Sequence, residues 1–191
     1  MKEWYMISTE ESYITERYYL NHTQYFCPKC GYFRGGNLYD LAIGSIHDEI
    51  AKICEIDKII VNERGKEVLE NICPADIAIQ AIKKAGYYLV DVLPVADIYE
   101  EKIEYYKEPC DVCGTYRSVL FRKASYFPDV SIFSLMKRRP DSIYKICRTS
   151  IQFGDSNMAG YVVFVDEELK EALEQLNCKH LGFLKCVDMI E

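Results

Sequence analysis

Apolar and polar residues follow one another along this chain in short blocks, and two periods can be distinguished. Blocks rich in Tyr, Ile, Val and Leu, bounded by polar turns, predict β-strands because β-branched and aromatic side chains favour extended backbone. These predicted strands span residues 4–8, 13–20, 58–61, 87–95, 161–165 and 180–190. The stretch 40–56 fits neither a strand nor a helix clearly, and its type stays open.

A second set of blocks has apolar residues at every third or fourth position, which is the spacing of a helix with one buried face. These predicted helices span residues 63–72, 74–85 and 167–176. Asn62 and Asp166 stand directly before the first and third helices, where a short polar side chain can accept a hydrogen bond from a free backbone amide. Gly86 follows the second helix and is expected to end it in the left-handed conformation.

The mixture of short strands and capped helices predicts an α+β fold. Each half of the chain has a pair of cysteines, then a strand, a capped helix and a late strand. This similarity between the halves has two interpretations, an internal duplication or the recurrence of elements that are common in mixed folds, and both stay open. The 191 residues are enough for a single compact domain over 1–191, or for two lobes, 1–107 and 108–191, with a seam within 97–109.

Composition narrows the class of protein. With 49% hydrophobic and 28% charged residues, the chain is typical of a globular protein. No apolar run approaches the roughly 18 residues that a membrane-spanning helix needs, and the N-terminal segment is acidic where a signal peptide would be apolar. Nine cysteines, an odd number, argue against an exported chain with paired disulfides. We therefore expect a cytoplasmic protein without a membrane partner.

Four of the cysteines form two CxxCG motifs, with Cys27 and Cys30 in the first and Cys110 and Cys113 in the second. Zinc takes four ligands in a tetrahedron, and a two-residue gap lets both thiolates of one turn reach the same ion. A glycine follows each pair, and its conformational freedom lets the turn fold back on the thiolates. The motifs predict two zinc knuckles that share one Zn²⁺ in a split, ribbon-like site, with a large insertion between them.

This metal is expected to be structural. Catalytic zinc keeps a coordination position open for water and usually has His or carboxylate ligands, whereas four thiolates fill the site. The three histidines, His22, His47 and His180, stand in no zinc-hydrolase motif, and the sequence has no nucleophile elbow, phosphate loop or dinucleotide-binding glycine pattern. The sequence therefore predicts no catalytic residue and no enzymatic activity.

The other five cysteines are interpreted as small core residues, as buried cysteines commonly are. They are Cys54, Cys73, Cys147, Cys178 and Cys186. The stretch 178–186 offers an alternative metal site through Cys178, His180 and Cys186, although its spacing matches no zinc knuckle.

The net charge of −7 lies mostly in residues 1–107. An acidic surface repels nucleic-acid phosphates and suits a basic protein partner, although many soluble proteins are equally acidic. Basic residues cluster only at 121–123 and 137–140, near the aromatic residues Tyr116, Phe121, Tyr126 and Phe127. Basic and aromatic residues beside a zinc knuckle could bind single-stranded nucleic acid, so this class stays open as the alternative, with an ordinary solvated face as the simpler interpretation.

The two cysteine motifs, the first as CPxCG, and the C-terminal stretch 161–190 resemble the double-CXXCG motif family. The motif residues that carry the resemblance are Cys27, Pro28, Cys30, Gly31, Cys110, Cys113 and Gly114. The second motif lacks the proline, and the segment between the motifs is short for the family. The family is linked to bacterial immunity against contact-delivered toxins.

The resemblance implies a non-enzymatic immunity protein that binds and neutralises one cognate toxin domain, with zinc in a structural role. The acidity of the chain makes a basic toxin domain the expected partner, and Glu100, Glu101 and Glu104 form the first surface to test. The alternative is a zinc-ribbon nucleic-acid-binding or regulatory module, which would need a basic face around Arg122 and Arg138.

Overall fold

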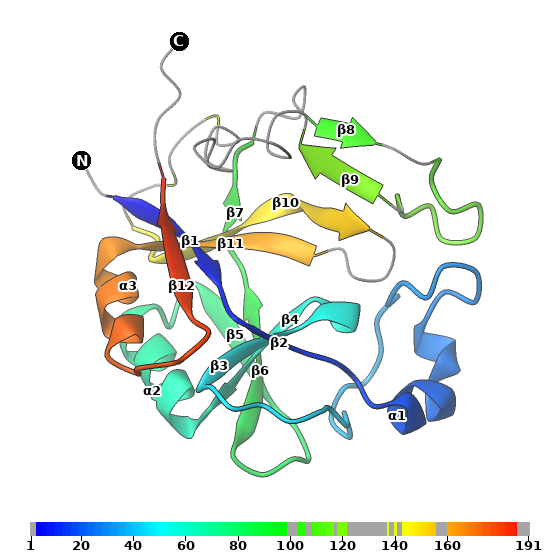
Figure 1. Ribbon diagram of the computed structural model, residues 1–191, viewed down its shortest axis with the longest axis horizontal. Helices are drawn as coiled ribbons and strands as arrows, with labels where there is room; N and C mark the ends of the chain where they lie inside the picture. The colour runs from blue at the N-terminus through cyan, green and yellow to red at the C-terminus, as the bar shows by residue number, and fades with distance from the viewer. Residues whose placement is uncertain are drawn as a thin grey trace.

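The computed structural model is a mixed α+β structure with two sheets and few helices, which confirms the α+β part of the predicted fold (Figure 1). The described residues are 3–98, 103–105, 108–116, 118–121, 137, 140, 143–155 and 160–186.

The larger sheet has seven strands and takes its members from both ends of the chain. Its strand order is β12 (Gly182–Lys185), β1 (Trp4–Ser8), β11 (Gly160–Asp166), β10 (Ile146–Asp155), β9 (Ser118–Phe121) and β8 (Ile103–Tyr105), with β7 (Val95–Ala96) also paired to β10. The first strand of the chain therefore lies between two of the last ones.

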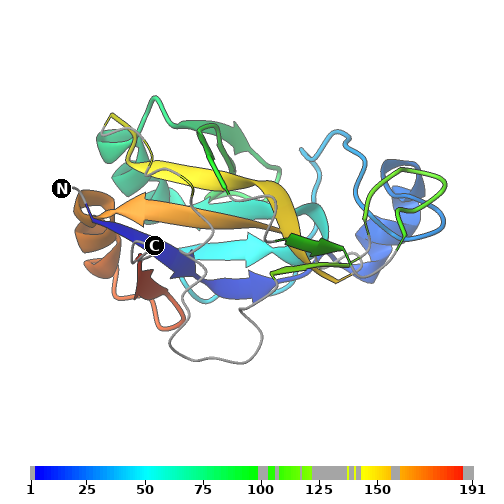
Figure 2. The same ribbon diagram turned by 90° about the horizontal axis from the view of Figure 1, so that it is seen from above.

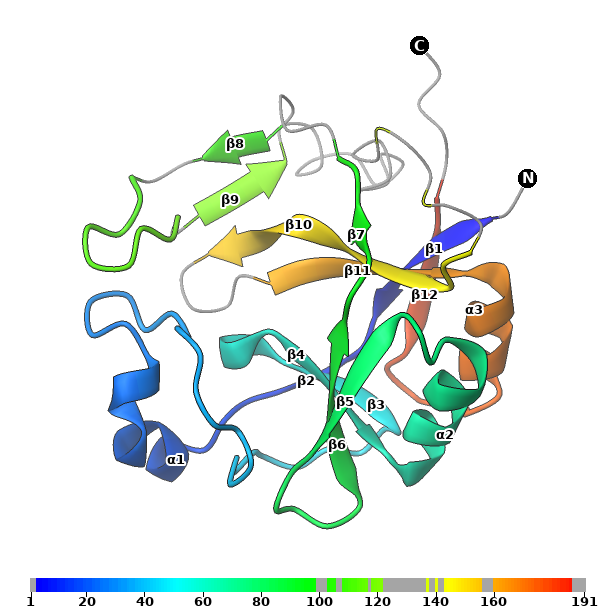
Figure 3. The ribbon, with the colours of Figure 1, turned by 180° about the vertical axis from the view of Figure 1, so that it is seen from behind.

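The smaller sheet has five strands, all from the first half of the chain. Its order is β2 (Glu10–Ser12), β3 (Ile50–Ile53), β4 (Lys58–Asn62), β6 (Tyr87–Val92) and β5 (Ile77–Ala81). The helices are α1 (Glu16–Asn21), α2 (Glu63–Ile72) and α3 (Glu167–Glu174), with two short 3-10 helices at Thr23–Tyr25 and Cys54–Ile56. All three overall views place α2 and α3 together at one end of the molecule and α1 at the other (Figures 1, 2 and 3).

The sheets are built from two structural repeats that have the same order of elements. The first repeat runs β1–β2–β3–β4–α2–β5, and the second runs β6–β7–β10–β11–α3–β12. In each repeat the short second strand pairs parallel with the next sheet strand, which then forms an antiparallel hairpin. The helix follows the hairpin directly, and a cysteine pair lies between the short strand and the hairpin.

The first strand of each repeat is exchanged with the other repeat. β1 pairs with β11 and β12 of the second repeat, while β6 pairs with β4 and β5 of the first, all antiparallel. Figure 1 shows β1 beside β11 before the chain continues into β2 of the other sheet. The exchange is therefore reciprocal, because each repeat places its first strand in the sheet of the other.

Equivalent residues also make equivalent local contacts. The side chains of Asn62 and Asp166 cap α2 and α3, accepting hydrogen bonds from the amides of Gly65 at 3.1 Å and Leu169 at 2.9 Å. Both caps were predicted from the sequence, and both fix the start of a helix at the end of a strand. Identical residues at equivalent positions of α2 and α3 are Glu63 and Glu167, Lys66 and Lys170, Glu67 and Glu171, Leu69 and Leu173, and Glu70 and Glu174.

The repeat extends to contacts between the exchanged strands and the helices. Lys66 of α2 lies over the ring of Tyr88, with its Nζ 4.5 Å from the ring centre, and Lys170 of α3 lies over the ring of Tyr5 at 5.1 Å. By sheet register, Tyr88 of β6 and Tyr5 of β1 occupy equivalent positions. Each helix therefore holds a strand that belongs to the other repeat.

The main hydrophobic core lies between the two sheets and the helix pair, and it contains equivalent residues from both repeats. Ile50 and Ile146, Val61 and Val165, and Leu69 and Leu173 all belong to it and are at most 1% exposed. Each sheet has a second cluster as well. In the smaller sheet it includes Tyr18, Phe26 and Ile60, and in the larger sheet it includes Trp4, Cys147 and Phe164.

Residues 13–20, which the sequence predicts to be a strand, contain α1 instead. The hydroxyl of Thr15 accepts a hydrogen bond from the amide of Tyr18 at 3.3 Å and so caps this helix. The prediction was wrong because the aromatic content was given more weight than this cap. A six-residue helix buries the Tyr18 ring, which is 3% exposed, as well as a strand would.

Residues 74–85, predicted as a helix, contain strand β5 instead. β5 pairs with β6 along its whole length, and Gly86, with φ of 76°, lies in the turn between the two strands. The helical spacing of Ile77, Ala78, Ala81 and Ile82 was coincidental, since a short apolar run cannot distinguish the two periods by itself. The undecided stretch 40–56 forms β3 and a 3-10 turn, and the predicted strand 87–95 is divided into β6 and β7.

Candidate metal centre

Each CxxCG motif folds into a tight knuckle with the same backbone hydrogen bonds. The amide of Gly31 donates to the carbonyl of Cys27 at 2.8 Å, and the amide of Gly114 donates to the carbonyl of Cys110 at 2.7 Å. Both glycines have φ of 72°, a left-handed conformation that a side chain would disfavour. The flanking bridges, Phe26 to Phe33 and Pro109 to Tyr116, are equivalent as well. The two knuckles are therefore equivalent parts of the two structural repeats.

The knuckles face each other and bring all four predicted thiols together. The sulfur atoms of Cys27, Cys30, Cys110 and Cys113 lie within 4.8 Å of one another. The Sγ atoms of Cys27 and Cys110 are 3.8 Å apart, and those of Cys30 and Cys113 are 3.5 Å apart. Four sulfurs around a tetrahedral ion with bonds of about 2.3 Å would be separated by about 3.8 Å. This cluster is compatible with a metal site.

Backbone amides surround the inner thiols of the cluster. Amides of Val112 and Cys113 donate to the Cys110 sulfur and lower the pKa of this thiol to about 6. Burial raises the pKa of Cys27, but hydrogen bonds from the amides of Cys30 and Lys29, together with those from neighbouring thiols, outweigh it, so the net shift is downward. These donors favour thiolates, which are the form that binds metals.

The pKa of the Cys30 thiol shifts in the opposite direction. Burial raises the pKa of Cys30 to about 12, although an amide donates to its sulfur. Neighbouring thiolates repel one another, so the four cannot all ionise unless a cation is present. The donor set therefore fits a divalent metal that prefers sulfur ligands, because such a metal neutralises the charge that would otherwise accumulate.

Outside the sulfurs, the two knuckles are joined by an exposed ion pair. Lys29 Nζ lies 2.7 Å from Asp111 Oδ2. Lys29 stands between the two cysteines of the first knuckle, and Asp111 stands between those of the second. Cys27 and Cys110 are buried, at 0% and 3% exposure, whereas Cys30 and Cys113 are half-buried. An ion in this cluster would be covered on its inner side and near the surface on its outer side.

The remaining cysteines stay apart from this cluster. Cys54, Cys73 and Cys147 are buried within 4% exposure, and burial raises the pKa of Cys73 to about 12. Cys178 is half-buried and contacts a Glu49 carboxylate oxygen at 3.3 Å. The alternative site at 178–186 does not form among the described residues, because the His180 side chain instead contacts the carboxylate of Asp48.

That carboxylate belongs to a second cluster that sequence reasoning missed, formed by Glu10, Asp48 and His180. Asp48 is 7% exposed and accepts hydrogen bonds from the amides of Lys179 at 3.0 Å and His180 at 2.7 Å. Glu10 accepts from the amides of His47 and Asp48 at 2.8 and 2.9 Å. Because backbone amides already occupy these oxygens, the cluster serves to link the first repeat to the loop before β12.

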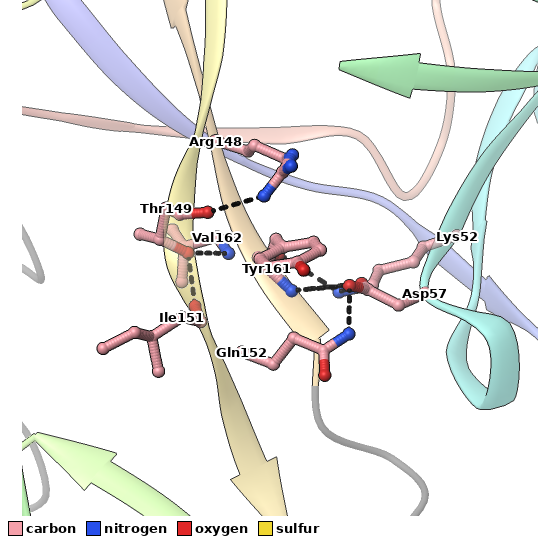
Figure 4. Close-up of polar contacts among 8 residues, drawn as sticks. All are labelled: Lys52, Asp57, Arg148, Thr149, Ile151, Gln152, Tyr161 and Val162. Carbon is pink, nitrogen blue, oxygen red and sulfur yellow. Dashed lines mark hydrogen bonds and ion pairs between the residues drawn. The ribbon is translucent and has the colours of Figure 1, made fainter. Parts of the chain in front are cut away.

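A third polar cluster lies between the sheets, around Asp57 (Figure 4). Asp57 has φ of 50° and ends the hairpin turn before β4. Its carboxylate accepts hydrogen bonds from the Tyr161 amide at 3.0 Å and from Gln152 Nε2 at 2.9 Å, and it pairs with Lys52 at 3.0 Å. A single side chain from the smaller sheet therefore ties together both strands of the β10–β11 hairpin.

Several surface predictions lie outside the described residues. These are Glu100, Glu101, Arg122, Lys123, Tyr126, Phe127, Arg138 and Arg139. Of the two basic clusters, the structure describes the exposed Lys137, Pro140 and the backbone of Phe121, and it describes the backbone of Glu104 in β8. Within the described ranges, no helix is both long and apolar enough to cross a membrane.

Comparison with known proteins adds no assignment to this geometry, because neither a family model nor a curated protein matches the chain. The resemblance to the double-CXXCG motif family stays a prediction that depends on the two motifs and the C-terminal stretch.

Proposed function

We propose that the four clustered thiols hold one structural Zn²⁺ as a split zinc ribbon, and that the chain is an immunity protein. The observation that supports a bound metal is the meeting of two equivalent CxxCG knuckles from remote parts of the chain. Zinc suits this set because it is borderline soft and accepts four thiolates in a tetrahedron. Such an ion would join the two repeats at the end of the molecule opposite α2 and α3.

A binding role is favoured over catalysis. Four thiolates complete the coordination of zinc, so the ion would serve the fold and leave the recognition of a partner to another surface. A zinc staple and a shared core would keep that surface rigid, which lowers the ordering cost of association. The resemblance supplies the class of partner, a cognate toxin domain.

The face formed by α2 and α3 is the described surface that best suits a basic toxin domain. Seven exposed glutamates lie on these two helices, against three basic residues, Arg64, Lys66 and Lys170. Glu67 and Glu171 occupy equivalent positions, and neither makes an ion pair with a described residue. An acidic patch of this kind attracts a basic partner and speeds encounter.

The metal is tested by measuring zinc per chain in the purified protein and in Cys110→Ser. We expect one ion per chain in the unaltered protein and a clear loss in the variant. Cys178→Ser is the matched control, because Cys178 lies outside the cluster and should leave the zinc content unchanged. A zinc content that Cys110→Ser does not alter would rule out the shared site.

The immunity role predicts that a large secreted protein with a variable C-terminal toxin domain is encoded directly upstream of this gene, and that domain is the one to co-express with this protein. Co-expression should restore growth and yield a complex that survives purification. Reversal of both Glu67 and Glu171 to Lys should slow association, while Glu16→Lys with Glu108→Lys, on exposed residues outside the α2–α3 face, should not. If co-expression gives neither complex nor rescue, the proposal fails. Retention on single-stranded nucleic acid that falls steeply with salt would instead favour the alternative module.

A further inference from the structure

A cavity of about 540 Å³ opens between the two sheets, and no part of the proposed toxin recognition uses it. Its walls come from the β3–β4 hairpin, from β6, from the β10–β11 hairpin and from residues 32–35, which follow the first knuckle. This volume is within the range of small-molecule binding sites, which have mostly apolar walls and a few oriented polar groups. The charges and apolar walls of the cavity indicate which ligand would fit.

Six charged side chains line this cavity, and four of them neutralise one another. Lys52 pairs with Asp57 at 3.0 Å, and Lys58 pairs with Asp91. The remaining two are Arg34 and Arg148, and neither has a carboxylate partner among the described residues. In a chain with net charge −7, two guanidinium groups therefore lie around a single cavity without a carboxylate partner in the part of the chain that the structure describes.

Arg148 is held in a fixed position by its neighbours (Figure 4). Its Nη1 donates to the Thr149 carbonyl at 3.1 Å, as Figure 4 shows. Its Nε donates to the Val92 carbonyl at 3.0 Å. Its guanidinium carbon lies 4.0 Å from the centre of the Tyr161 ring. A guanidinium has five N–H donors, so donors remain for a ligand, and the stacking on Tyr161 orients them in advance.

Apolar side chains form the wall beside this arginine. Val90, Val92 and Val163 are at the cavity, together with Leu93, whose side chain is 52% exposed. An exposed leucine at the rim of a cavity is typical of a surface that a ligand covers. The walls therefore suit a molecule with an apolar body and an acidic group.

The equivalent position in the other repeat provides an internal comparison. A smaller cavity of about 300 Å³ lies beside β1, and there Lys52 stands where Arg148 stands in the first cavity. This lysine is already neutralised by Asp57, and the knuckle segment 32–35 does not line the smaller cavity. The two cavities share their position in the fold, but among the described residues that line them, a positive side chain without a carboxylate partner is found at the larger cavity only.

We propose that the larger cavity binds a small organic anion. The acidic group, a carboxylate or a phosphate, contacts Arg148, and Arg34 at the rim adds attraction. The apolar body lies along Val92 and Leu93. This inference is independent of the toxin partner, because the cavity lies between the sheets while the acidic face is on α2 and α3.

The test uses the full chain with its metal, labelled with ¹⁵N and titrated with four small aromatic probes. Benzoate and phenyl phosphate carry the acidic group, benzyl alcohol is neutral and benzylamine is cationic. We expect saturable shifts of the Leu93 and Tyr161 amides with at least one anion, and about tenfold weaker binding of the neutral and cationic probes. The tighter of the two anions identifies the acidic group. If neither anion saturates, or if benzyl alcohol binds as tightly, the proposal is wrong.

Substitutions then locate the site. Arg148→Gln should weaken the anion by about ten- to a hundredfold, because one charge-assisted contact is lost. Arg17→Gln removes the same charge from an exposed position on α1 and should have no effect. Equal effects of these two variants would show that the anion senses net charge only, which would overturn the site.

A second pair of variants avoids the hydrogen bonds that Arg148 makes to the backbone. Leu93 is half exposed, so Leu93→Glu and Leu93→Gln should both fold. The glutamate places a like charge at the rim and should weaken the anion by about tenfold more than the glutamine does. Equal binding by these two variants would place the anion elsewhere.

Discussion

The two structural repeats differ in what they attach to a shared centre. Between β2 and β3 the first repeat inserts α1 and the loop that carries Leu38, Leu41 and Ile43, and these residues cover the outer face of the smaller sheet. Between β7 and β10 the second repeat inserts β8 and β9, which extend the larger sheet. The caps, the helices and the knuckles are common to both, so these parts carry the fold.

The comparison also separates stability from recognition. Equivalent residues such as Leu69 and Leu173 lie in the core, and equivalent cysteines lie in the thiol cluster. Residues without a counterpart of the same kind, such as Asp57 and Asp91, lie around the larger cavity. We expect changes at equivalent positions to have equal effects in the two repeats, and the first two predictions test this expectation. The third tests a contact that only one repeat provides, and the predictions run from the largest effect to the smallest.

Loss of the metal should have the largest effect. Structural zinc has an apparent binding free energy on the order of 10 kcal/mol, which is comparable with the whole stability of a domain. Chelation should therefore lower the melting temperature strongly, and Cys27→Ser and Cys110→Ser should lower it to a similar degree. Melting curves by circular dichroism measure this effect, with Cys178→Ser as the unaffected control. A chelated protein that melts as the untreated one does would show that no metal supports the fold.

The paired core leucines come next. Leu69→Ala and Leu173→Ala each remove a side chain that is at most 1% exposed, and each should lower the free energy of unfolding by about 2–5 kcal/mol. Urea unfolding measures both, and Leu20→Ala, at 62% exposure on α1, should change little. The equivalence of the repeats would fail in energetic terms if only one of the two core variants were strongly destabilised.

Asp57 tests a contact that one repeat alone provides. Asp57→Asn keeps a residue that tolerates the left-handed backbone but loses the charge that faces Lys52, and it should destabilise the protein by about 1–3 kcal/mol. Asp91→Asn is the matched control, because its pair with Lys58 lies near the surface, where such pairs are worth about 0–1 kcal/mol. Equal values in urea unfolding would show that Asp57 does not bind the sheets together.

The smallest effect concerns pH. Burial alone would raise the pKa of Asp48, but the amide donors of His180 and Lys179 outweigh it and hold the pKa below its usual value. A carboxylate with a lowered pKa stabilises the folded state above the unfolded pKa of about 4, and this contribution is lost as the pH falls through the folded pKa. Asp48→Asn should flatten the decline in unfolding free energy that sets in below about pH 5 and continues as the pH falls through the folded pKa. An unchanged slope would contradict this role.

The sequence predicted the local features well where a few residues fix the backbone. Asn62 and Asp166 give clear helix starts because a cap needs only three neighbouring residues. The CxxCG spacing brings the two sulfurs of one turn together, and the glycine that follows is required by the left-handed angle. The meeting of the two pairs could also be predicted, because four thiols within two similar turns suit one ion.

Contacts between remote segments could not be predicted in this way. β5 was taken for a helix because its apolar spacing is ambiguous, and only the presence of β6 decides its conformation. The exchange of β1 and β6 leaves no sign in either strand, since an apolar strand pairs with any suitable edge. Asp57 was not singled out for the same reason, because its role depends on Gln152 and Tyr161 in the other sheet.

The exchange of first strands also determines when the protein can complete its fold during synthesis. β1 leaves the ribosome more than 150 residues before its only two strand partners in the described structure, β11 and β12, which lie at residues 160–185. Until those residues emerge, Trp4 and Tyr5 have no sheet to enter, and they stay available to chaperones or to neighbouring nascent chains. The larger sheet can therefore be completed only after β11 and β12 have been made, long after β1 itself.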